Sequence, residues 1–263
     1  MEWTSKDGFR VEAGLEPAPK HAEAKELVYS RLIIPAIKGV MKAQGLQITI
    51  QGAEHIPADG AGLIACNHTS YMDFIFAGIP ARLRGKRLVR FMTKREIFDV
   101  KGVGTLMRAM KHIRVDRAAG AASLDEAVRR LKAGQLVGIF PEGTISRDFE
   151  LGQLKSGAVR IAQAADAPLI PMAMWGAQQL WTKGHKKKMG RHHFPIWMKV
   201  GQPIDASGDV EAATQRLHSA MAELLAEVQH DYEQTYGPVK MEPAKMEPAK
   251  TERAKTERTK TEQ

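Results

Sequence analysis

The chain has 263 residues, of which 43% are apolar and 6% aromatic, and its 39 Lys or Arg against 30 Asp or Glu give a net charge of +9. This length and apolar content allow one sizeable α/β domain or two small ones, and the low aromatic share argues against an all-β sandwich. The single cysteine, Cys66, excludes an intrachain disulfide framework and a zinc site made of cysteines alone.

The positive charge indicates an anionic partner. The five-residue repeat that begins at Lys240 contributes about +2, which leaves +7 for the part of the chain that can fold. Basic globular surfaces are typical of proteins that bind nucleic acid, an anionic membrane or an anionic substrate. Few aromatic side chains stand among the basic clusters and no nucleic-acid-binding motif occurs. A membrane or a phosphorylated substrate is therefore favoured, and no nucleic acid is expected as a partner.

The first twenty residues are polar, contain Gly and Pro, and are expected to be loosely ordered. Residues 22–43 predict an amphipathic helix that Pro35 kinks or divides in two. Its apolar face suits either packing on the core or an interfacial position, in which Leu32 and Ile33 would enter the lipid. The longest unbroken apolar run in this region, 32–37, is far shorter than the roughly 20 residues of a bilayer span. With no secretory signal visible, the chain is expected to lie on a membrane without crossing it.

Short apolar runs then alternate with helical patterns. The runs lie at 46–50, 62–66, 88–92, 112–115, 135–140, 168–174 and 196–200, and the helical patterns at 71–82, 102–110, 121–133, 156–165 and 209–234. This alternation predicts an α/β fold with a mixed, largely parallel central sheet flanked by helices. We expect an N-terminal segment (1–43) with the helical motif, a main domain (44–238) and a disordered charged tail (239–263).

The sharpest motif is NHTSYMD at 67–73, directly after the apolar run 62–66. A polar turn after a strand presents its side chains at the sheet edge, where the active sites of α/β proteins gather. His68 can act there as a general base, and Asp73 can fold back to fix its tautomer and stabilise the imidazolium. A structural turn histidine is the alternative, because such a spacing also arises by chance. Cys66 ends an apolar strand and is expected to be a buried structural thiol.

Two further segments carry polar groups at strand ends. In FPEGT (140–144), Gly143 permits a close backbone approach, and Glu142 suits either substrate hydroxyls or stabilisation of the turn. Arg147 nearby suits a phosphate. In IRVDR (113–117), an arginine after a strand suits either bidentate phosphate binding or a surface ion pair with Asp116.

In this order, and with Lys94 in FMTKREIF, KSGA at 155–158 and a proline in a later strand, these segments resemble the glycerolipid acyltransferase family of the lysophosphatidate type. The resemblance covers about residues 45–205 and makes 44–238 an acyltransferase domain. It implies acyl transfer from acyl-CoA or acyl carrier protein to the free hydroxyl of 1-acylglycerol 3-phosphate, giving phosphatidic acid, without a cofactor. The alternatives are another acceptor, such as glycerol 3-phosphate or a different lysophospholipid, or a non-catalytic peripheral lipid-binding protein.

The resemblance also implies residue roles. His68 would be the base and Asp73 its orienting acid, with direct attack on the thioester and no acyl-enzyme. The glycerol phosphate would be bound by Lys94, Arg117, Glu142, Gly143, Thr144 and Arg147, and the site would be shaped by Asn67 and Pro171. Ile145 stands where the family commonly has Arg, so which cation meets the phosphate is open.

The segment 175–198 combines tryptophans with a run of cations. Trp181, Lys186 and Lys187 suit a membrane interface, where rings lie at headgroup depth and cations meet anionic lipids. The histidines in this segment lack metal-site spacing, and no metal is expected. The resulting expectation is a peripheral, monotopic protein on the cytoplasmic face of the cell membrane.

Overall fold

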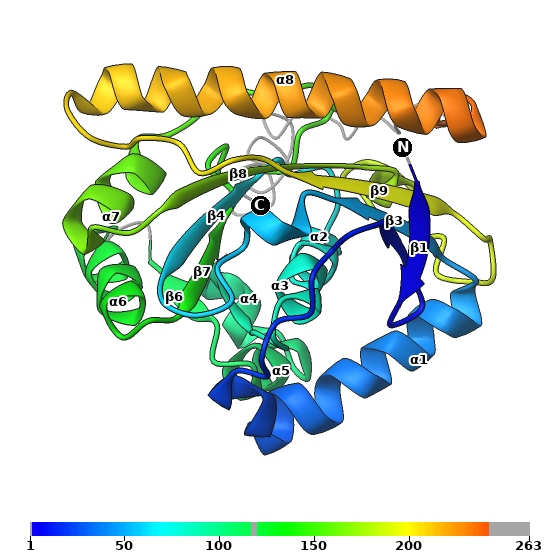
Figure 1. Ribbon diagram of the computed structural model, residues 1–263, viewed down its shortest axis with the longest axis horizontal. Coiled ribbons are helices and arrows are strands. Elements are labelled where there is room, and N and C mark those ends of the chain that lie inside the picture. Colours follow the sequence, from blue (N-terminus) through cyan, green and yellow to red (C-terminus); the bar gives the residue numbers. More distant parts are fainter. Residues whose placement is uncertain (1, 117–119, 242–263) are drawn as a thin grey trace, which may run out of the picture.

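The computed structural model describes residues 2–116 and 120–241, and within them nine strands form one sheet (Figure 1). The strand order is β1-β2-β3-β9-β8-β4-β7-β5-β6. The strands are β1 Trp3–Lys6, β2 Phe9–Glu12, β3 Gln47–Gln51, β4 Gly62–Cys66, β5 Val89–Lys94, β6 Ile113–Val115, β7 Leu136–Ile139, β8 Leu169–Trp175 and β9 Pro195–Val200. The pairs β1–β2 and β8–β9 are antiparallel and the other neighbours are parallel, which confirms the mixed, largely parallel sheet.

Helices cover both faces of this sheet (Figure 1). They are α1 Ile34–Gln44, α2 Asp73–Phe76, α3 Ile79–Leu83, α4 Arg95–Asp99, α5 Val103–Ala109, α6 Gly120–Lys132, α7 Gly157–Ala165 and α8 Val210–Tyr236, with the short η1 Ala22–Lys25, η3 Ala53–His55 and η4 Ala177–Gln179 and the π-helical η2 Leu27–Ile33. The long α8 runs along one face with α6 and α7 beside it, and α1, α2 and α3 lie on the other face.

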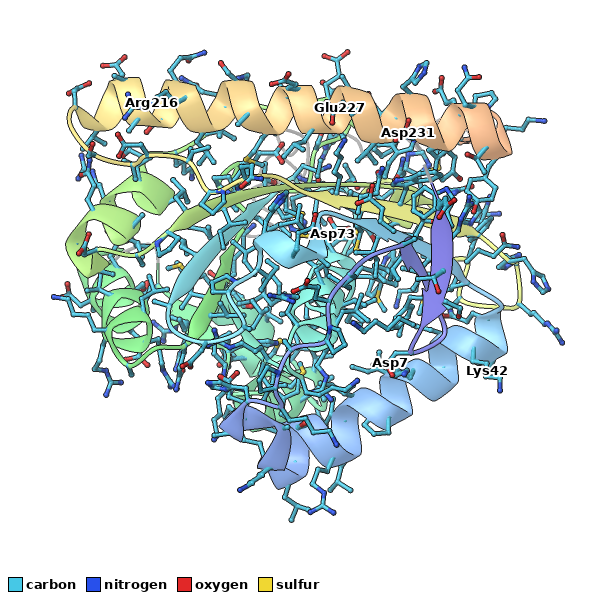
Figure 2. The ribbon with its side chains drawn as sticks, viewed as in Figure 1. Asp7, Lys42, Asp73, Arg216, Glu227 and Asp231 are labelled. Carbon is cyan, nitrogen blue, oxygen red and sulfur yellow. The ribbon has the colours of Figure 1, made fainter. Side chains whose placement is uncertain are left out.

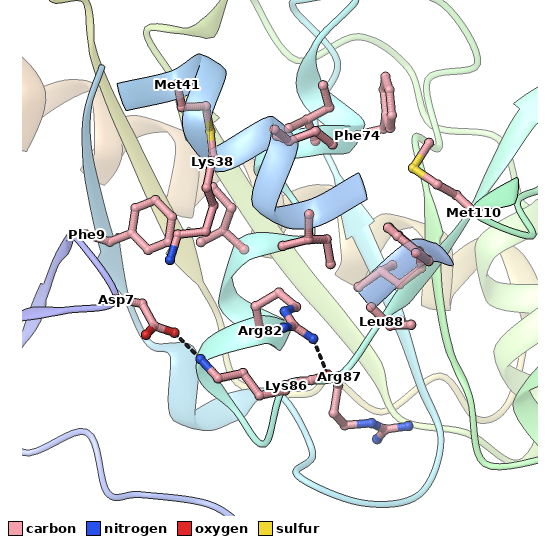
Figure 3. A pocket seen from close by; sticks show the side chains of 17 residues that line it. Asp7, Phe9, Lys38, Met41, Phe74, Arg82, Lys86, Arg87, Leu88 and Met110 are labelled. Carbon is pink, nitrogen blue, oxygen red and sulfur yellow. Dashed lines mark hydrogen bonds and ion pairs between the residues drawn. The ribbon is translucent and has the colours of Figure 1, made fainter. Parts of the chain in front are cut away.

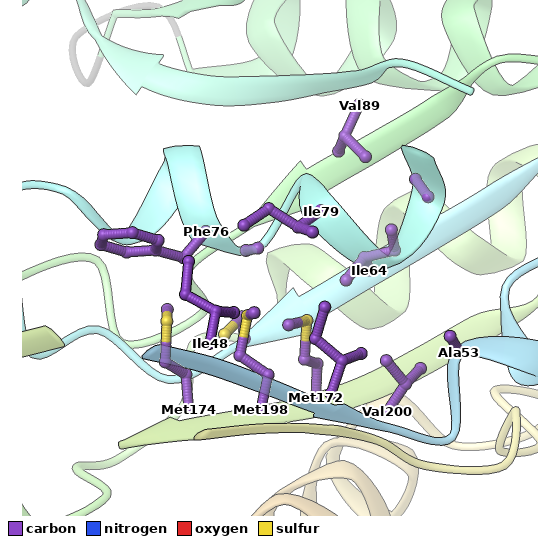
Figure 4. Packing of buried hydrophobic residues seen from close by; sticks show 14 of the residues in the cluster. Ile48, Ala53, Ile64, Phe76, Ile79, Val89, Met172, Met174, Met198 and Val200 are labelled. Atoms are coloured by element: carbon purple, nitrogen blue, oxygen red, sulfur yellow. The ribbon is translucent and has the colours of Figure 1, made fainter. Parts of the chain in front are cut away.

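Strand β4 shows why helices must cover both faces of the sheet. Its side chains alternate between the two faces, as the pleat of a strand requires. Leu63 and Ala65 pack in the cluster that α6, α7 and α8 close, whereas Ile64 and Cys66 pack in the cluster that contains α2 and α3. Figure 4 shows the second cluster, in which Phe76 and Ile79 face methionines of β8 and β9. An uninterrupted apolar run is therefore the pattern of a parallel strand buried on both sides.

The expectation of a loosely ordered start is wrong, because β1 and β2 form a hairpin that joins the sheet edge. Asp7 and Gly8 at its turn have φ values of 57° and 85°, the left-handed conformation that Asp-Gly adopts in a tight hairpin. Strand β2 continues parallel to β3, with Arg10 opposite Thr49. The buried side chains of Phe9 and Val11 alternate along it and provide the packing that holds the hairpin.

The predicted break in the helix over 22–43 is confirmed. The segment forms η1, the π-helical η2 and then α1, in which Pro35 occupies the first turn. Proline is tolerated there because the first helical N–H groups have no intrahelical partner. Similarly, the helix predicted over 71–82 is divided into α2 and α3, and Pro80 lies in the first turn of α3. The charged repeat falls almost entirely outside the described residues, so its predicted disorder stays a prediction.

None of the helices within residues 2–116 and 120–241 is both long and apolar enough to cross a membrane. The side chains that remain exposed include four large apolar ones on η2 and α1. These are Leu27, Val28, Leu32 and Val40, with exposed fractions of 45–60%. Figure 2 places Asp73 near the centre of the molecule and Lys42, at the end of α1, at its edge. The exposed apolar side chains thus lie on elements that also carry exposed cations, Arg31 on η2 and Lys42 on α1.

Candidate active site

Polar residues from separate parts of the chain meet at one edge of the sheet. The NHTSYMD segment follows β4, the FPEGT segment follows β7, and Lys94 is the last residue of β5. These three strands are neighbours and parallel, so their carboxyl ends lie at the same edge. Such an edge is where α/β proteins place their ligands.

The centre of this site is the pair His68 and Asp73. Nδ1 of His68 lies 2.9 Å from Oδ2 of Asp73, the first residue of α2. The same oxygen accepts hydrogen bonds from the backbone N–H groups of Thr69 and Ser70, each at 2.7 Å. Asp73 is fully buried, whereas the His68 side chain is 20% exposed. With the ring proton on Nδ1, Nε2 is left as the nitrogen that can take a proton from a substrate.

Glu142 holds the backbone of His68. Its Oε1 accepts a hydrogen bond from the His68 N–H at 2.8 Å, and its Oε2 accepts one from the Gly152 N–H at 3.1 Å. The carbonyl of His68 in turn accepts from the Ser146 N–H at 2.8 Å. Burial raises the pKa of the Glu142 carboxyl above its ordinary value. Both carboxylate oxygens thus bind backbone, which is the arrangement expected of the turn-stabilising role.

A stack of aromatic rings supports the imidazole from one side. The ring of Phe140 lies parallel to that of His68 at 4.2 Å between centroids, and Phe91 of β5 stacks on Phe140 at 5.6 Å. Gly138 is opposite Phe91 in the sheet, and a Cβ at this position would lie 2.3 Å from the Phe91 ring. Sequence reasoning missed this stack, because the facing of Phe91 and Phe140 depends on the register of β5 against β7.

The two residues predicted to shape the site occupy different places. Asn67 joins the end of β4 to β8, since its Nδ2 donates to the Met174 carbonyl at 3.0 Å and its Oδ1 accepts from the Met174 N–H at 2.8 Å. Pro171 lies further back in β8, opposite Ala65, and packs against Gly201. Asn67 therefore fixes the residue next to His68, while Pro171 contributes from the interior of the sheet.

Of the residues predicted to bind the glycerol phosphate, Glu142, Gly143, Thr144 and Arg147 lie in or just after the FPEGT turn, and Lys94 ends β5. Gly143 has a φ of 71°, and a Cβ there would lie 3.0 Å from Nζ of Lys155, which places this lysine beside the turn. Sequence reasoning did not assign Lys155 to the site, although the KSGA block contains it. Lys94, Thr144 and Arg147 are exposed, and Ile145 is buried. Arg117 lies outside the described residues.

Cys66 lies two residues before His68 and is fully buried. Burial raises the pKa of its thiol well above the ordinary value, and the carboxylates of Asp73 and Glu142 raise it further. The thiol is consequently protonated at neutral pH. A protonated, inaccessible thiol is a poor nucleophile, in agreement with the structural role expected from its position in an apolar strand.

The residues predicted for the membrane interface do not all face outward. On η2, Leu32 is 57% exposed, whereas Ile33 is half-buried against the cluster that contains Leu88 and Phe98. The rings of Trp181 and Tyr71 are in contact, with 4.7 Å between their centroids, and Nζ of Lys187 lies 3.6 Å from the centroid of the Trp181 ring. The side chains of Lys186 and Lys187 are exposed.

Comparison with known proteins agrees with this arrangement. Residues 47–175 match the family described as Acyltransferase. The 1-acyl-sn-glycerol-3-phosphate acyltransferase of Bacillus subtilis (strain 168) is 31% identical over 194 residues, which cover 72% of this chain and 89% of that protein. The protein of the same name from Limnanthes douglasii is 36% identical over 167 residues, 61% of this chain and 56% of the plant protein.

A solved structure extends the comparison to the fold. The crystal structure of the 1-acyl-sn-glycerophosphate (LPA) acyltransferase, PlsC, from Thermotoga maritima superposes with a TM-score of 0.58 at 26% sequence identity. The match covers 73% of this chain and 78% of that one. Motifs, site geometry and similarity over most of the length agree, and the chain belongs to the acyltransferase family, as a homologue of the 1-acyl-sn-glycerol-3-phosphate O-acyltransferases of phospholipid biosynthesis.

Proposed function

We propose that this protein transfers an acyl group from an acyl thioester to the free hydroxyl of 1-acylglycerol 3-phosphate and so forms phosphatidic acid. The observation that carries the proposal is the 2.9 Å contact between His68 Nδ1 and the buried carboxylate of Asp73. The acceptor follows from the relatives, two of which are 1-acyl-sn-glycerol-3-phosphate acyltransferases by name.

In the proposed reaction, Nε2 of His68 takes the proton of the acceptor hydroxyl while the oxygen attacks the thioester carbonyl. The C–S bond then breaks, and the thiolate that leaves takes the proton from the imidazolium. Asp73 stabilises the imidazolium that forms between these steps. A positioned base supplies about 10²–10⁴ in rate, and holding the two substrates together supplies more. The burial of Cys66 supports direct transfer without an acyl-enzyme.

A cleft between α1 and the α2–α3 segment has largely apolar walls and supports lipid substrates (Figure 3). Its charged lining consists of Asp7 and the cations Lys38, Arg82, Lys86 and Arg87. Phe74 and Ile75, which directly follow Asp73, are among its walls, and Met41 and Met110 line it elsewhere. The Phe74 ring also contacts Phe91, which belongs to the aromatic stack beside His68. Apolar walls suit an acyl chain, so the cleft favours an acylated acceptor over glycerol 3-phosphate.

The phosphate of the acceptor is proposed to lie at the FPEGT turn. Lys155 is beside Gly143, and Lys94 ends the neighbouring strand β5. Arg147 and Thr144 are exposed on the same loop. Cations at such an edge suit a phosphate, and the left-handed Gly143 allows the backbone to approach it closely. Arg117 stays a further predicted ligand.

Membrane binding is proposed as the way in which the enzyme reaches its substrates. The exposed apolar side chains of η2 and α1 would enter the lipid, and Lys186 and Lys187 would meet anionic headgroups. The segment with these lysines adjoins the end of α1, because Gln44 donates to the Met189 carbonyl at 2.9 Å. The two elements can therefore act as one interfacial surface on the cytoplasmic leaflet.

The reaction is tested with purified protein, liposomes and matched donor and acceptor panels. We expect thiol release from acyl-CoA or acyl carrier protein only when a lysophospholipid is present, with 1-acylglycerol 3-phosphate as the best acceptor. Mass spectrometry identifies the product. Thiol release that is equally fast without an acceptor would mean a thioesterase, and a preference for glycerol 3-phosphate would assign the earlier acylation step.

A further inference from the structure

The segment after β8 forms hydrogen bonds with the turn that follows His68. We infer that Thr182 is a positioning residue for His68, acting through the Thr69–Ser70 peptide group and Asp73. This inference rests on the proposed role of His68 as the base. Thr182 belongs to no motif of the sequence, and it lies 113 residues from its partner Thr69.

The first observation is the hydrogen bond that Thr182 makes. Its hydroxyl donates to the Thr69 carbonyl at 2.6 Å, and the two residues are 1% and 2% exposed. The carbonyl of Thr69 and the N–H of Ser70 belong to one peptide group. That N–H donates to Oδ2 of Asp73 at 2.7 Å. The peptide group is thus held at its oxygen by Thr182 and at its nitrogen by the carboxylate that binds His68.

A second set of contacts fixes the next peptide. The carbonyl of Trp181 accepts hydrogen bonds from the Ser70 hydroxyl at 2.8 Å and from the Tyr71 N–H at 3.0 Å. The segment is itself anchored, since Leu180 is 1% exposed in the core and its carbonyl accepts from the Lys188 N–H at 2.7 Å. Residues 181 and 182 are therefore anchored themselves, and their hydrogen bonds hold the turn 69–71 in place.

The effect on His68 follows from the shared peptide. A hydrogen bond accepted by a peptide oxygen polarises the group and strengthens the bond that its N–H donates. Without the Thr182 hydroxyl, the buried carbonyl of Thr69 loses a partner, and the peptide is free to rotate toward another donor. Such a rotation moves the Ser70 N–H away from Asp73, and the carboxylate then no longer fixes the imidazole. Misplacement of a reacting group by about 1 Å lowers turnover on the order of 100-fold.

The test compares two substitutions that separate the hydroxyl of Thr182 from the shape of its side chain. Thr182→Val removes the hydroxyl and keeps the shape, and Thr182→Ser keeps the hydroxyl. We expect Thr182→Val to lower kcat by about 10- to 100-fold with little change in either KM, and Thr182→Ser to stay near wild type. Thr235→Val on α8 is the matched control, because it removes a hydroxyl that donates to the Asp231 carbonyl at 2.8 Å far from the site in sequence. Activity of this control should be unchanged.

A spectroscopic measurement separates positioning from folding. The proton between His68 Nδ1 and Asp73 is followed by NMR in ¹⁵N-histidine-labelled protein, with His68→Ala used to assign it. Its resonance should move in Thr182→Val and stay in place in Thr182→Ser. If Thr182→Val does not fold, Thr182→Ala serves as the second variant for both measurements.

Wild-type kcat and an unmoved proton resonance in a folded variant without the hydroxyl would overturn the inference. An equal loss in Thr182→Ser would overturn it as well, because the hydroxyl would then not be the cause. These outcomes differ from failure of the proposed reaction, in which His68→Ala itself retains turnover.

Discussion

At the scale of single residues, the site is a histidine held from several directions. Asp73 Oδ2 binds the ring and two backbone N–H groups, Glu142 binds the backbone N–H of His68, and Phe140 covers one face of the ring. Each contact removes a freedom of motion from the imidazole. The imidazole is therefore held in one orientation before substrate binds, which is the condition for efficient proton transfer by the proposed base.

The buried carboxyl of Glu142 gives a prediction about pH and stability. Burial raises its pKa in the folded protein above the ordinary 4.5, so the ionised form is disfavoured there relative to the unfolded chain. The protonated Glu142 carboxyl contributes its full stabilisation when the pH is below its pKa in the unfolded chain. That stabilisation is lost as the pH rises through its higher pKa in the folded protein. We expect the free energy of unfolding of wild type minus that of Glu142→Gln to fall as the pH is raised from about 4.5.

Denaturant unfolding at a series of pH values measures this difference. Glu223→Gln, an exposed position on α8, is the control for substituting a carboxylate as such. A difference between wild type and Glu142→Gln that stays constant or grows with pH would contradict the assigned shift.

The pairing of His68 with Asp73 could be predicted from the sequence, but the contacts around this pair could not. The interval of five between His68 and Asp73 is visible in the motif, and a turn after a strand brings such residues together. The bond from the His68 N–H to Glu142 spans 74 residues and depends on β7 being the neighbour of β4. Strand order follows from packing of the whole domain, so no local pattern could have indicated this contact.

At the scale of elements, the register of β5 against β7 decides how the stack behind His68 is built. Gly138 is required there because a side chain would collide with Phe91. We expect Gly138→Ala to lower the free energy of unfolding by about 1–3 kcal/mol and to lower kcat, since Phe91 must shift against Phe140. Chemical denaturation and turnover assays measure the two effects.

Gly39→Ala is the matched control, because a Cβ at this helical position meets no atom within 4 Å. It should be neutral or slightly stabilising, as an alanine in an exposed helix is. Equal stability of Gly138→Ala and wild type would show that the ring of Phe91 has room to move.

The exposed apolar side chains of η2 and α1 give a prediction about membranes. Leu32→Glu places a charge on the face proposed to enter lipid, and we expect binding to anionic liposomes to fall on the order of tenfold. Ala226→Glu adds the same charge to an exposed position on α8, which lies at the other end of the molecule in Figure 1, and should have little effect. Co-sedimentation at several salt concentrations measures both.

Binding of Leu32→Glu equal to wild type would mean that η2 does not insert. Binding by the other surface element, the lysines at 186–188, would then be tested by its loss at high salt.

The elements themselves were largely predictable, with one informative failure. Apolar runs and helical periods predicted β3 through β9 and the long helices, because burial on both faces leaves a strong pattern. The hairpin of β1 and β2 was missed because its strands are short and mostly polar, although Asp7-Gly8 is a turn signal. Trp181 is predicted for the membrane interface, but the contacts of the Trp181 carbonyl and the Thr182 hydroxyl with the turn 69–71 depend on tertiary packing alone.

At the scale of the whole molecule, one arrangement accounts for the distribution of features. Parallel strands bring the NHTSYMD and FPEGT turns to one edge, the apolar cleft adjoins α2 and α1, and exposed apolar side chains lie on η2 and α1. In the proposed function, a lipid acceptor would pass from such a surface along the largely apolar cleft to His68. The net charge of +7 before the repeat suits the anionic headgroups and the phosphate of that proposal.

The central claim is that His68 is the base for acyl transfer to a lysophospholipid hydroxyl, and phosphatidate formation by wild type and His68→Ala tests it most directly. Wild type should convert 1-acylglycerol 3-phosphate and acyl donor into phosphatidic acid. His68→Ala should lose about 10²–10⁴ of that rate while its unfolding midpoint stays close to that of wild type. Phosphatidate formation by folded His68→Ala at the wild-type rate would contradict the account.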